Sequence, residues 1–74
     1  MKEDRQIEWK EDWLCDAGFY KGTRFFECFE WEKSQWEVRL ILGGFKTKIG
    51  TYTTIKSAKR GAERFLKRLQ EAVK

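Results

Sequence analysis

Basic side chains are the residues of this 74-residue chain whose types and spacing could support a function. Residues 1–38 carry six basic and ten acidic groups (6 − 10 = −4), whereas residues 39–74 carry ten basic and two acidic groups (10 − 2 = +8). Such a split suggests a basic surface that meets a polyanion or an acidic protein. An acidic N-terminal part that folds back against a basic C-terminal part would explain some of the asymmetry equally well.

Two groups of cations are candidates for such a surface. The first is on the predicted sheet and consists of Arg39, Lys46 and Lys48, beside Ile41, Tyr52 and Phe26. The second is on the predicted C-terminal helix and consists of Lys56, Lys59, Arg60, Arg64, Lys67 and Arg68. Cations neutralise phosphates and aromatic rings stack on bases, so both groups favour nucleic-acid binding. The alternative is a solvated surface on which lysines protect a sheet edge.

Catalytic and metal sites are not indicated. The chain has no histidine, which excludes a Cys–His or Ser–His dyad within it, and Cys15 and Cys28 alone do not make a zinc site. Gly43-Gly44 lacks the following Lys-Ser/Thr of a phosphate loop. We therefore expect a non-enzymatic protein without a metal or another cofactor.

The two cysteines and the N-terminus predict a cytoplasmic protein. Two cysteines do not form a disulfide framework, so we expect reduced thiols, with a single disulfide as the alternative. Residues 1–5 are charged and no apolar segment follows them, unlike a signal peptide. No apolar run approaches the roughly 18 residues that cross a bilayer, so we expect no membrane partner.

Residues 36–52 must position the first group of cations. They alternate around Gly43-Gly44, which predicts a hairpin whose tight turn has positive φ at both glycines. The expected pairs are Leu42–Phe45, Leu40–Thr47, Val38–Ile49 and Trp36–Thr51. The expected core face consists of Trp36, Val38, Leu40, Leu42, Phe45 and Ile49. The opposite, solvated face consists of Glu37, Arg39, Ile41, Lys46, Lys48 and Tyr52.

A helix that begins near Thr54 must position the second group. Thr53 or Thr54 is the expected N-cap, because a hydroxyl accepts from the free amides of the first turn. At 3.6 residues per turn, one side of this helix is apolar. That side consists of Ile55, Ala58, Ala62, Phe65, Leu66, Leu69, Ala72 and Val73.

The first half of the chain is harder to interpret. Residues 24–31 are aromatic and predict a strand, joined by a turn at Lys33-Ser34. This register pairs Trp31 with Trp36, Phe29 with Val38 and Glu30 with Glu37. It also places Glu27 on the core face, a fault that a bulge or a longer turn would correct.

Residues 7–17 are ambiguous. Trp9 and Trp13 are four residues apart, which favours a short helix that ends at Gly18, although Ile7-Glu8-Trp9 also alternates like a strand. We expect a loop over 19–23 and a frayed segment over 1–6. The predicted fold is α+β: one domain over 1–74, with a three-stranded antiparallel sheet packed on the C-terminal helix. Its sheet-and-helix core spans 24–73, and the short N-terminal helix is the favoured form of 7–17.

The segment Ile49-Gly50-Thr51-Tyr52-Thr53-Thr54, with Ala58 after it and Trp36 before it, resembles the ethylene-response-factor type of DNA-binding domain. The resemblance covers about residues 24–70 and is sharp only over 49–58. It implies a three-stranded sheet that enters the major groove. The matching strand positions are Arg24, Trp31, Arg39, Lys46 and Lys48. Four glutamates depart from the arginine-rich first hairpin of that family: Glu27, Glu30, Glu32 and Glu37.

Lys56-Ser57-Ala58-Lys59, followed by Ala62, is similar to the start of the last helix in double-stranded-RNA-binding domains. This resemblance implies lysines that clamp phosphates across a groove, and an α-β-β-β-α order. Ile55 departs from it, because it stands where the first lysine of the motif would be.

The sequence therefore predicts a small domain that binds double-stranded nucleic acid through the basic sheet face and the basic helix. The alternative is a phage-type interaction module, similar to anti-CRISPR proteins, that inhibits a host protein through an acidic surface of that protein. Four tryptophans suit such a module, because aromatic anchors dominate binding hot spots.

Overall fold

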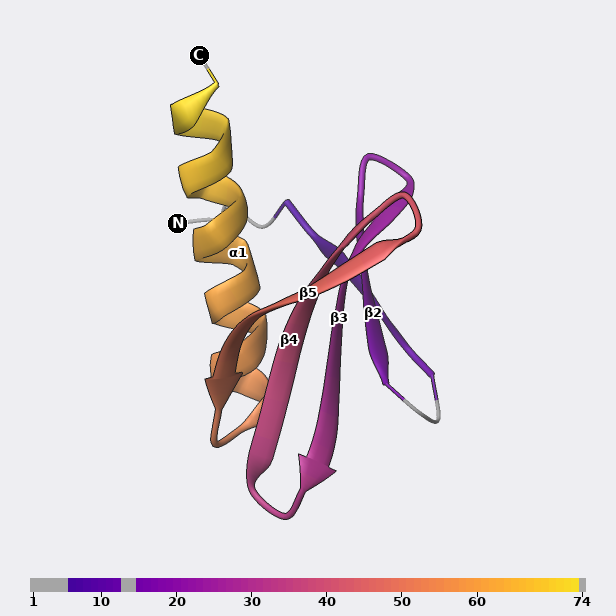
Figure 1. The fold of residues 1–74 in the computed structure, drawn as a ribbon, viewed down its shortest axis with the longest axis vertical. Helices are drawn as coiled ribbons and strands as arrows, with labels where there is room; N and C mark the ends of the chain where they lie inside the picture. The colour runs from indigo at the N-terminus through magenta and orange to yellow at the C-terminus, as the bar shows by residue number, and fades with distance from the viewer. Residues whose placement is uncertain (1–5, 13–14, 74) are drawn as a thin grey trace.

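The chain folds into an antiparallel sheet and one helix. The computed structural model describes residues 6–12 and 15–73. The elements are β1 (Glu8–Glu11), β2 (Asp16–Tyr20), β3 (Thr23–Glu32), β4 (Gln35–Leu42), β5 (Phe45–Tyr52) and α1 (Ile55–Ala72). Each strand pairs with the next in the order β1-β2-β3-β4-β5, and α1 lies along one side of the sheet (Figure 1). The α+β class is confirmed, but the described sheet has five strands where we predicted three.

The helix that we expected over residues 7–17 is wrong. Residues 8–11 form β1 and residues 16–17 begin β2, and Trp9 pairs with Gly18. A Cβ on Gly18 would collide with the ring of Trp9 and with Ile7. The indole thus occupies the space that glycine leaves on a strand, which is how an aromatic ring supports a glycine in a sheet. Trp13, whose separation of four residues from Trp9 favoured the helix, lies outside the described residues.

The segment before β1 is anchored to the helix. The backbone amides of Gln6 and Ile7 donate to the two carboxylate oxygens of Glu63, each over 3.3 Å. The frayed segment predicted over 1–6 is therefore wrong for Gln6, and its other five residues lie outside the described part of the chain.

The β4–β5 turn lies where it was predicted, but the positive φ expected at Gly44 is wrong, and the strands depart from the predicted register farther from the turn. Leu42 pairs with Phe45 and Leu40 with Thr47, as expected. Only Gly43 has a positive φ, of 60°, which is the pattern of a type II′ turn. A bulge between Val38 and Arg39 then shifts the register, so that Val38 pairs with Gly50.

This bulge explains why Tyr52 is not on the solvated face. Tyr52 pairs with Trp36, where we had expected Thr51. It packs against the core, and a Cβ on Gly61 of α1 would overlap its hydroxyl. A shift of one residue moves a strand side chain to the opposite face of the sheet.

A second bulge, between Glu30 and Glu32, sets the register of β3 against β4. Cys28 pairs with Val38 and Glu27 with Arg39, so the predicted partners Phe29–Val38, Trp31–Trp36 and Glu30–Glu37 are wrong. The core face of β3 carries Phe26 and Cys28, both fully buried. This register places Glu27 on the opposite face, as we expected if a bulge were present.

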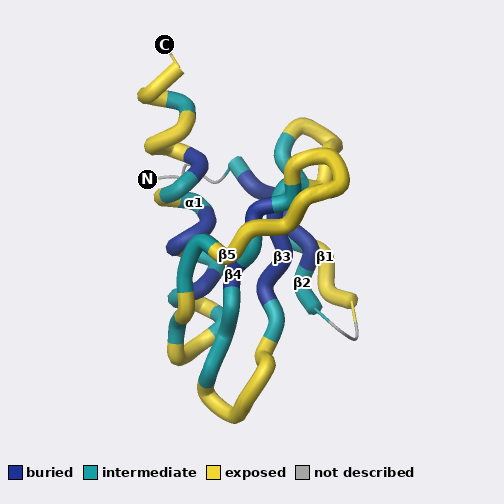
Figure 2. Tube along the Cα trace, in the orientation of Figure 1, coloured by how far each residue is buried: buried dark blue, intermediate teal, exposed yellow. Residues whose placement is uncertain are grey.

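The helix begins as predicted and ends beyond the core. Thr54 is the N-cap, and its Oγ1 accepts from the amide of Ser57 over 3.1 Å. Ala58, Gly61, Ala62 and Leu66 are the buried residues of α1. Leu69 and Val73 are 40% and 80% exposed, so the expected apolar side is only partly covered. In Figure 2 the buried segments lie on α1 and on the neighbouring parts of the sheet, and the β3–β4 and β4–β5 turns are exposed.

Candidate nucleic-acid interface

The predicted cations of the sheet lie on the face turned away from α1, here called the outer sheet face. Arg39 pairs with Lys48 across β4 and β5, and Ile41 pairs with Lys46. The structure therefore brings Arg39, Lys46 and Lys48 together, as expected. Two aromatic groups predicted beside them are absent from this face, because Tyr52 packs under the helix and Phe26 is fully buried in the core.

Carboxylates neutralise most of this charge. Glu27 is only 5% exposed, and it accepts from Arg24 Nη2 over 3.0 Å and lies 3.5 Å from Lys46 Nζ. Glu37 Oε2 accepts from Arg39 Nε over 2.6 Å. The guanidinium of Arg39 also lies 4.7 Å from the ring centroid of Phe29. A buried carboxylate is tolerated only when cations pair with it, so these arginine and lysine side chains are needed where they are.

Two cations of the outer sheet face have no carboxylate partner among the described residues: Lys10 of β1, which lies over the ring of Phe19, and Lys48 of β5. Lys48 is exposed and lies close to the β4–β5 turn. Its partner across the strands is Arg39, and like charges directly opposite each other are unfavourable. Near the β4–β5 turn, the outer sheet face therefore offers the charge of Lys48 beside the ion pairs of Lys46 and Arg39.

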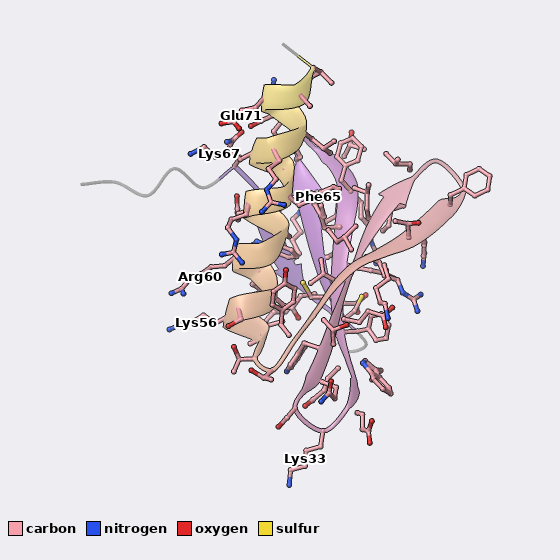
Figure 3. All side chains as sticks on the ribbon, turned by 60° about the vertical axis from the view of Figure 1, so that its left-hand side comes forward. Lys33, Lys56, Arg60, Phe65, Lys67 and Glu71 are labelled. Carbon is pink, nitrogen blue, oxygen red and sulfur yellow. The ribbon has the colours of Figure 1, made fainter. Side chains whose placement is uncertain are left out.

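The solvent side of α1 carries a different arrangement, here called the basic helix face. It consists of Lys56, Arg60, Arg64, Lys67 and Arg68, all exposed. Figure 3 shows Lys56, Arg60 and Lys67 pointing away from the sheet. None of the five forms an ion pair with another described residue. From Lys56 to Arg68 the row spans roughly 18 Å at 1.5 Å per residue.

Two acidic residues of the helix lie near this face. Glu63 turns toward the segment before β1, where it accepts from the amides of Gln6 and Ile7. Glu71 lies in the last turn of α1 on the same side as Lys67 (Figure 3), but it forms no ion pair with another described residue. The basic helix face is therefore the surface of α1 on which positive charge accumulates.

Lys59 is not part of this face, contrary to the prediction. Its Nζ lies 2.8 Å from Asp16 Oδ2 and 5.5 Å from the ring centroid of Trp9. Its side chain is 29% exposed. Lys59 thus fastens α1 to β1 and β2, and a phosphate would have to break an existing ion pair to reach it.

Both cysteines are free thiols. Cys28 lies in the core, and burial raises its pKa to about 12. Cys15 lies beside Arg24, whose Nη2 is 3.6 Å from the sulfur. Burial and then the charge of Glu27 raise the pKa of Cys15, against the lowering effect of Arg24. Neither thiol has the depressed pKa of a nucleophilic cysteine.

The sequence did not identify the carboxylates that determine which lysine and arginine side chains are paired and which are free. Glu27 was expected at a faulty core position, and no role was predicted for Glu63. Their partners, Lys46 and Gln6, are distant in sequence, so no local pattern could have revealed them. Within the described residues, no three Cys, Asp or Glu side chains gather as metal ligands would.

The described part of the chain contains no helix long and apolar enough to cross a membrane. Comparison of the chain with protein-family models, with curated proteins and with solved structures gave no match.

Proposed function

We propose that this protein is a small non-catalytic domain that binds double-stranded nucleic acid, with the basic helix face as its main contact surface. The observation that carries the proposal is the row of five exposed cations on α1 without ion pairs among the described residues. Cations of this kind release condensed counterions when they meet a phosphate backbone, and that release drives binding.

The charge balance favours the helix over the sheet. A phosphate that approaches the outer sheet face meets Glu27 and Glu37, and it would compete with them for Lys46 and Arg39. Taking a cation away from a largely buried carboxylate is costly, because the negative charge is left uncompensated. A phosphate that binds the basic helix face separates no ion pair. We therefore expect the cations of the sheet to serve at most as a secondary contact.

The expected mode of recognition is contact with the backbone of the nucleic acid. Lysine and arginine on a straight helix can follow a phosphate strand, and such contacts position a protein without reading sequence. The proposal therefore predicts similar affinity for duplexes of different sequence, and a strong dependence of that affinity on salt.

The test is a titration of fluorescent 20-base-pair DNA and RNA duplexes at several salt concentrations. The variant Lys56→Gln/Arg60→Gln/Arg64→Gln should lower affinity at least tenfold. It should also reduce the slope of log K against log salt by about 0.9 for each DNA phosphate that the variant no longer neutralises. The matched control, Arg39→Gln/Lys46→Gln/Lys48→Gln, removes the same charge and should change affinity much less.

Two results would refute the proposal. One is the absence of duplex binding by the unmodified protein at about 0.1 M salt. The other is an equal loss of affinity in the two triple variants, which would reflect net charge without a defined surface. A larger loss in the sheet variant would move the interface to the outer sheet face, as the first family resemblance implies.

A second candidate function is the inhibition of a host protein by a phage-type interaction module. Trp31 favours it, because this residue is 55% exposed beside the β3–β4 turn, between Glu30 and Glu32. Exposed tryptophan is a frequent interface anchor. A pull-down from a lysate, with and without nuclease, should recover a nuclease-resistant partner that Trp31→Ala loses; recovery that nuclease abolishes speaks against this candidate.

A further inference from the structure

One edge of the sheet is protected by the rest of the molecule, and the other edge is free. β1 forms one edge and has only four residues. The chain just before it is held by Glu63, which accepts from two successive backbone amides. An edge strand is a poor template for another strand when it is short and when a helix side chain already binds the backbone amides beside it.

β5 forms the other edge and is twice as long. Its first four residues, from Phe45 to Lys48, are all exposed, so this half is covered on neither face. Figure 1 shows this half of the β4–β5 hairpin extending away from α1. Half of the backbone groups of an edge strand face outward and remain available for hydrogen bonds.

The turn decides which residues offer those groups. In a two-residue hairpin the residues that flank the turn exchange backbone hydrogen bonds, and hydrogen-bonded and non-hydrogen-bonded pairs then alternate. Leu42–Phe45 is the flanking pair, and Ile41–Lys46 comes next. Lys46 and Lys48 therefore present their N–H and C=O groups to the free edge of β5.

The side chains of the same four residues specify a partner. Lys46 and Lys48 project from the outer sheet face, where Lys48 is without an ion pair among the described residues and lies opposite Arg39. Phe45 and Leu42 project from the opposite face and are 81% and 54% exposed. An incoming strand that places carboxylates beside the lysines and apolar groups beside Phe45 would satisfy both faces.

We propose that the free edge of β5 binds an extended acidic segment of a partner protein as an additional antiparallel strand. The segment alternates glutamate or aspartate with apolar residues, so that its carboxylates follow one another at the two-residue spacing of Lys46 and Lys48, about 6.8 Å in an antiparallel strand. Backbone hydrogen bonds supply affinity in this mode, and alternate side chains supply specificity.

A second copy of this chain does not fit the same edge. Antiparallel pairing of β5 with β5 would place lysine beside lysine, and like charges opposite each other destabilise a sheet. The like charges thus disfavour self-association, while Lys48, which has no ion pair among the described residues, attracts an acidic strand. This inference is independent of the proposed nucleic-acid binding, which uses the other side of the molecule.

The experiment titrates the protein with a fluorescein-labelled eight-residue peptide that alternates glutamate and valine. Lys46→Glu/Lys48→Glu should weaken binding at least tenfold, and Phe45→Ala should weaken it severalfold. The control Lys56→Glu/Arg60→Glu makes the same change of charge on the basic helix face and should leave binding within twofold. Because Lys46 also pairs with Glu27, Lys48→Glu alone is a second variant that leaves this pair intact.

Two methylated peptides test the strand geometry itself. In antiparallel pairing, a residue directly opposite Lys46 or Lys48 exchanges hydrogen bonds with it. The glutamate amides of the peptide therefore face β5, and its valine amides face solvent. N-methylation of the glutamate amides should abolish binding, and N-methylation of the valine amides should preserve it.

The proposal is overturned if the two methylated peptides bind equally, or if the charge reversals at the edge and on the helix have equal effects. It is also overturned if Lys46→Glu/Lys48→Glu weakens binding of a duplex and not of the peptide, because the edge would then serve nucleic acid.

Discussion

The two halves of the β4–β5 hairpin have the same alternating pattern and opposite surroundings. In the half far from the turn, Val38 is fully buried and Leu40 is 8% exposed beneath α1. In the half at the turn, Leu42 and Phe45 lie on the same face and are 54% and 81% exposed. Alternation thus predicts which face of a strand is apolar, and a second element decides whether that face becomes core.

The direction of the helix explains the difference. Glu63, at the middle of α1, and Gln70, near its end, tie the helix to Gln6 and to the hydroxyl of Tyr20, on the β1–β2 side of the sheet. The N-terminal half of α1 packs over Tyr52. The helix thereby crosses away from the β4–β5 turn and leaves that half of the hairpin bare.

The largest expected effect tests the two halves directly. Leu40→Ala should lower the free energy of unfolding by about 2–5 kcal/mol, because it opens a cavity beneath α1. Phe45→Ala, the control from the bare half, should stay within about 0.5 kcal/mol. Urea denaturation measures both values, and equal losses of stability would show that the turn half is also packed.

A smaller effect tests how closely α1 approaches the covered half. Glycine within a helix is usually improved by alanine, by about 1 kcal/mol. Gly61→Ala should instead destabilise the protein by about 1–3 kcal/mol, because its Cβ would overlap Tyr52. Combining it with Tyr52→Phe should recover part of the stability, since the hydroxyl is among the nearest atoms. An increase in thermal stability for Gly61→Ala would contradict this close contact.

The smallest effect concerns the thiol beneath the helix. The pKa of Cys28 is about 12 in the folded protein against 9.0 for a free thiol, so the unfolded chain releases this proton first. The contribution of Cys28 to stability is constant below pH 9 and declines as pH rises toward 12, by at most about 1.4 kcal/mol per pH unit. Denaturation from pH 8 to 10.5 should show a shallower decline for Cys28→Ala than for the unmodified protein. Parallel profiles would mean that Cys28 is not shielded from solvent.

The elements with strong local signals were predictable. The Gly-Gly turn requires a backbone that glycine adopts readily, and Gly43 does have a positive φ. The N-cap at Thr54 satisfies amides of its own first turn. Each of these features depends on residues within a few positions of one another, and for that reason the sequence alone located them.

The first two strands were not predictable in the same way. β1 is only four residues long, and the position of Trp9 depends on its packing against Gly18, nine residues away in the sequence. A short segment has too few positions to distinguish a strand period from a helical one. Pairing with β2 settles the question, and that pairing is a property of the assembled sheet.

By itself, the sequence determined the α+β class, the C-terminal helix with its cap, the central hairpin and the concentration of positive charge after residue 38. Only the tertiary structure decided which face of the sheet each side chain occupies. Each bulge adds one residue to a strand and so moves the side chains beyond it to the opposite face. The tertiary structure also decided which cations are free. Lys46 and Lys59 find carboxylates on distant strands, whereas the row from Lys56 to Arg68 remains exposed to solvent because the helix turns its other side to the sheet.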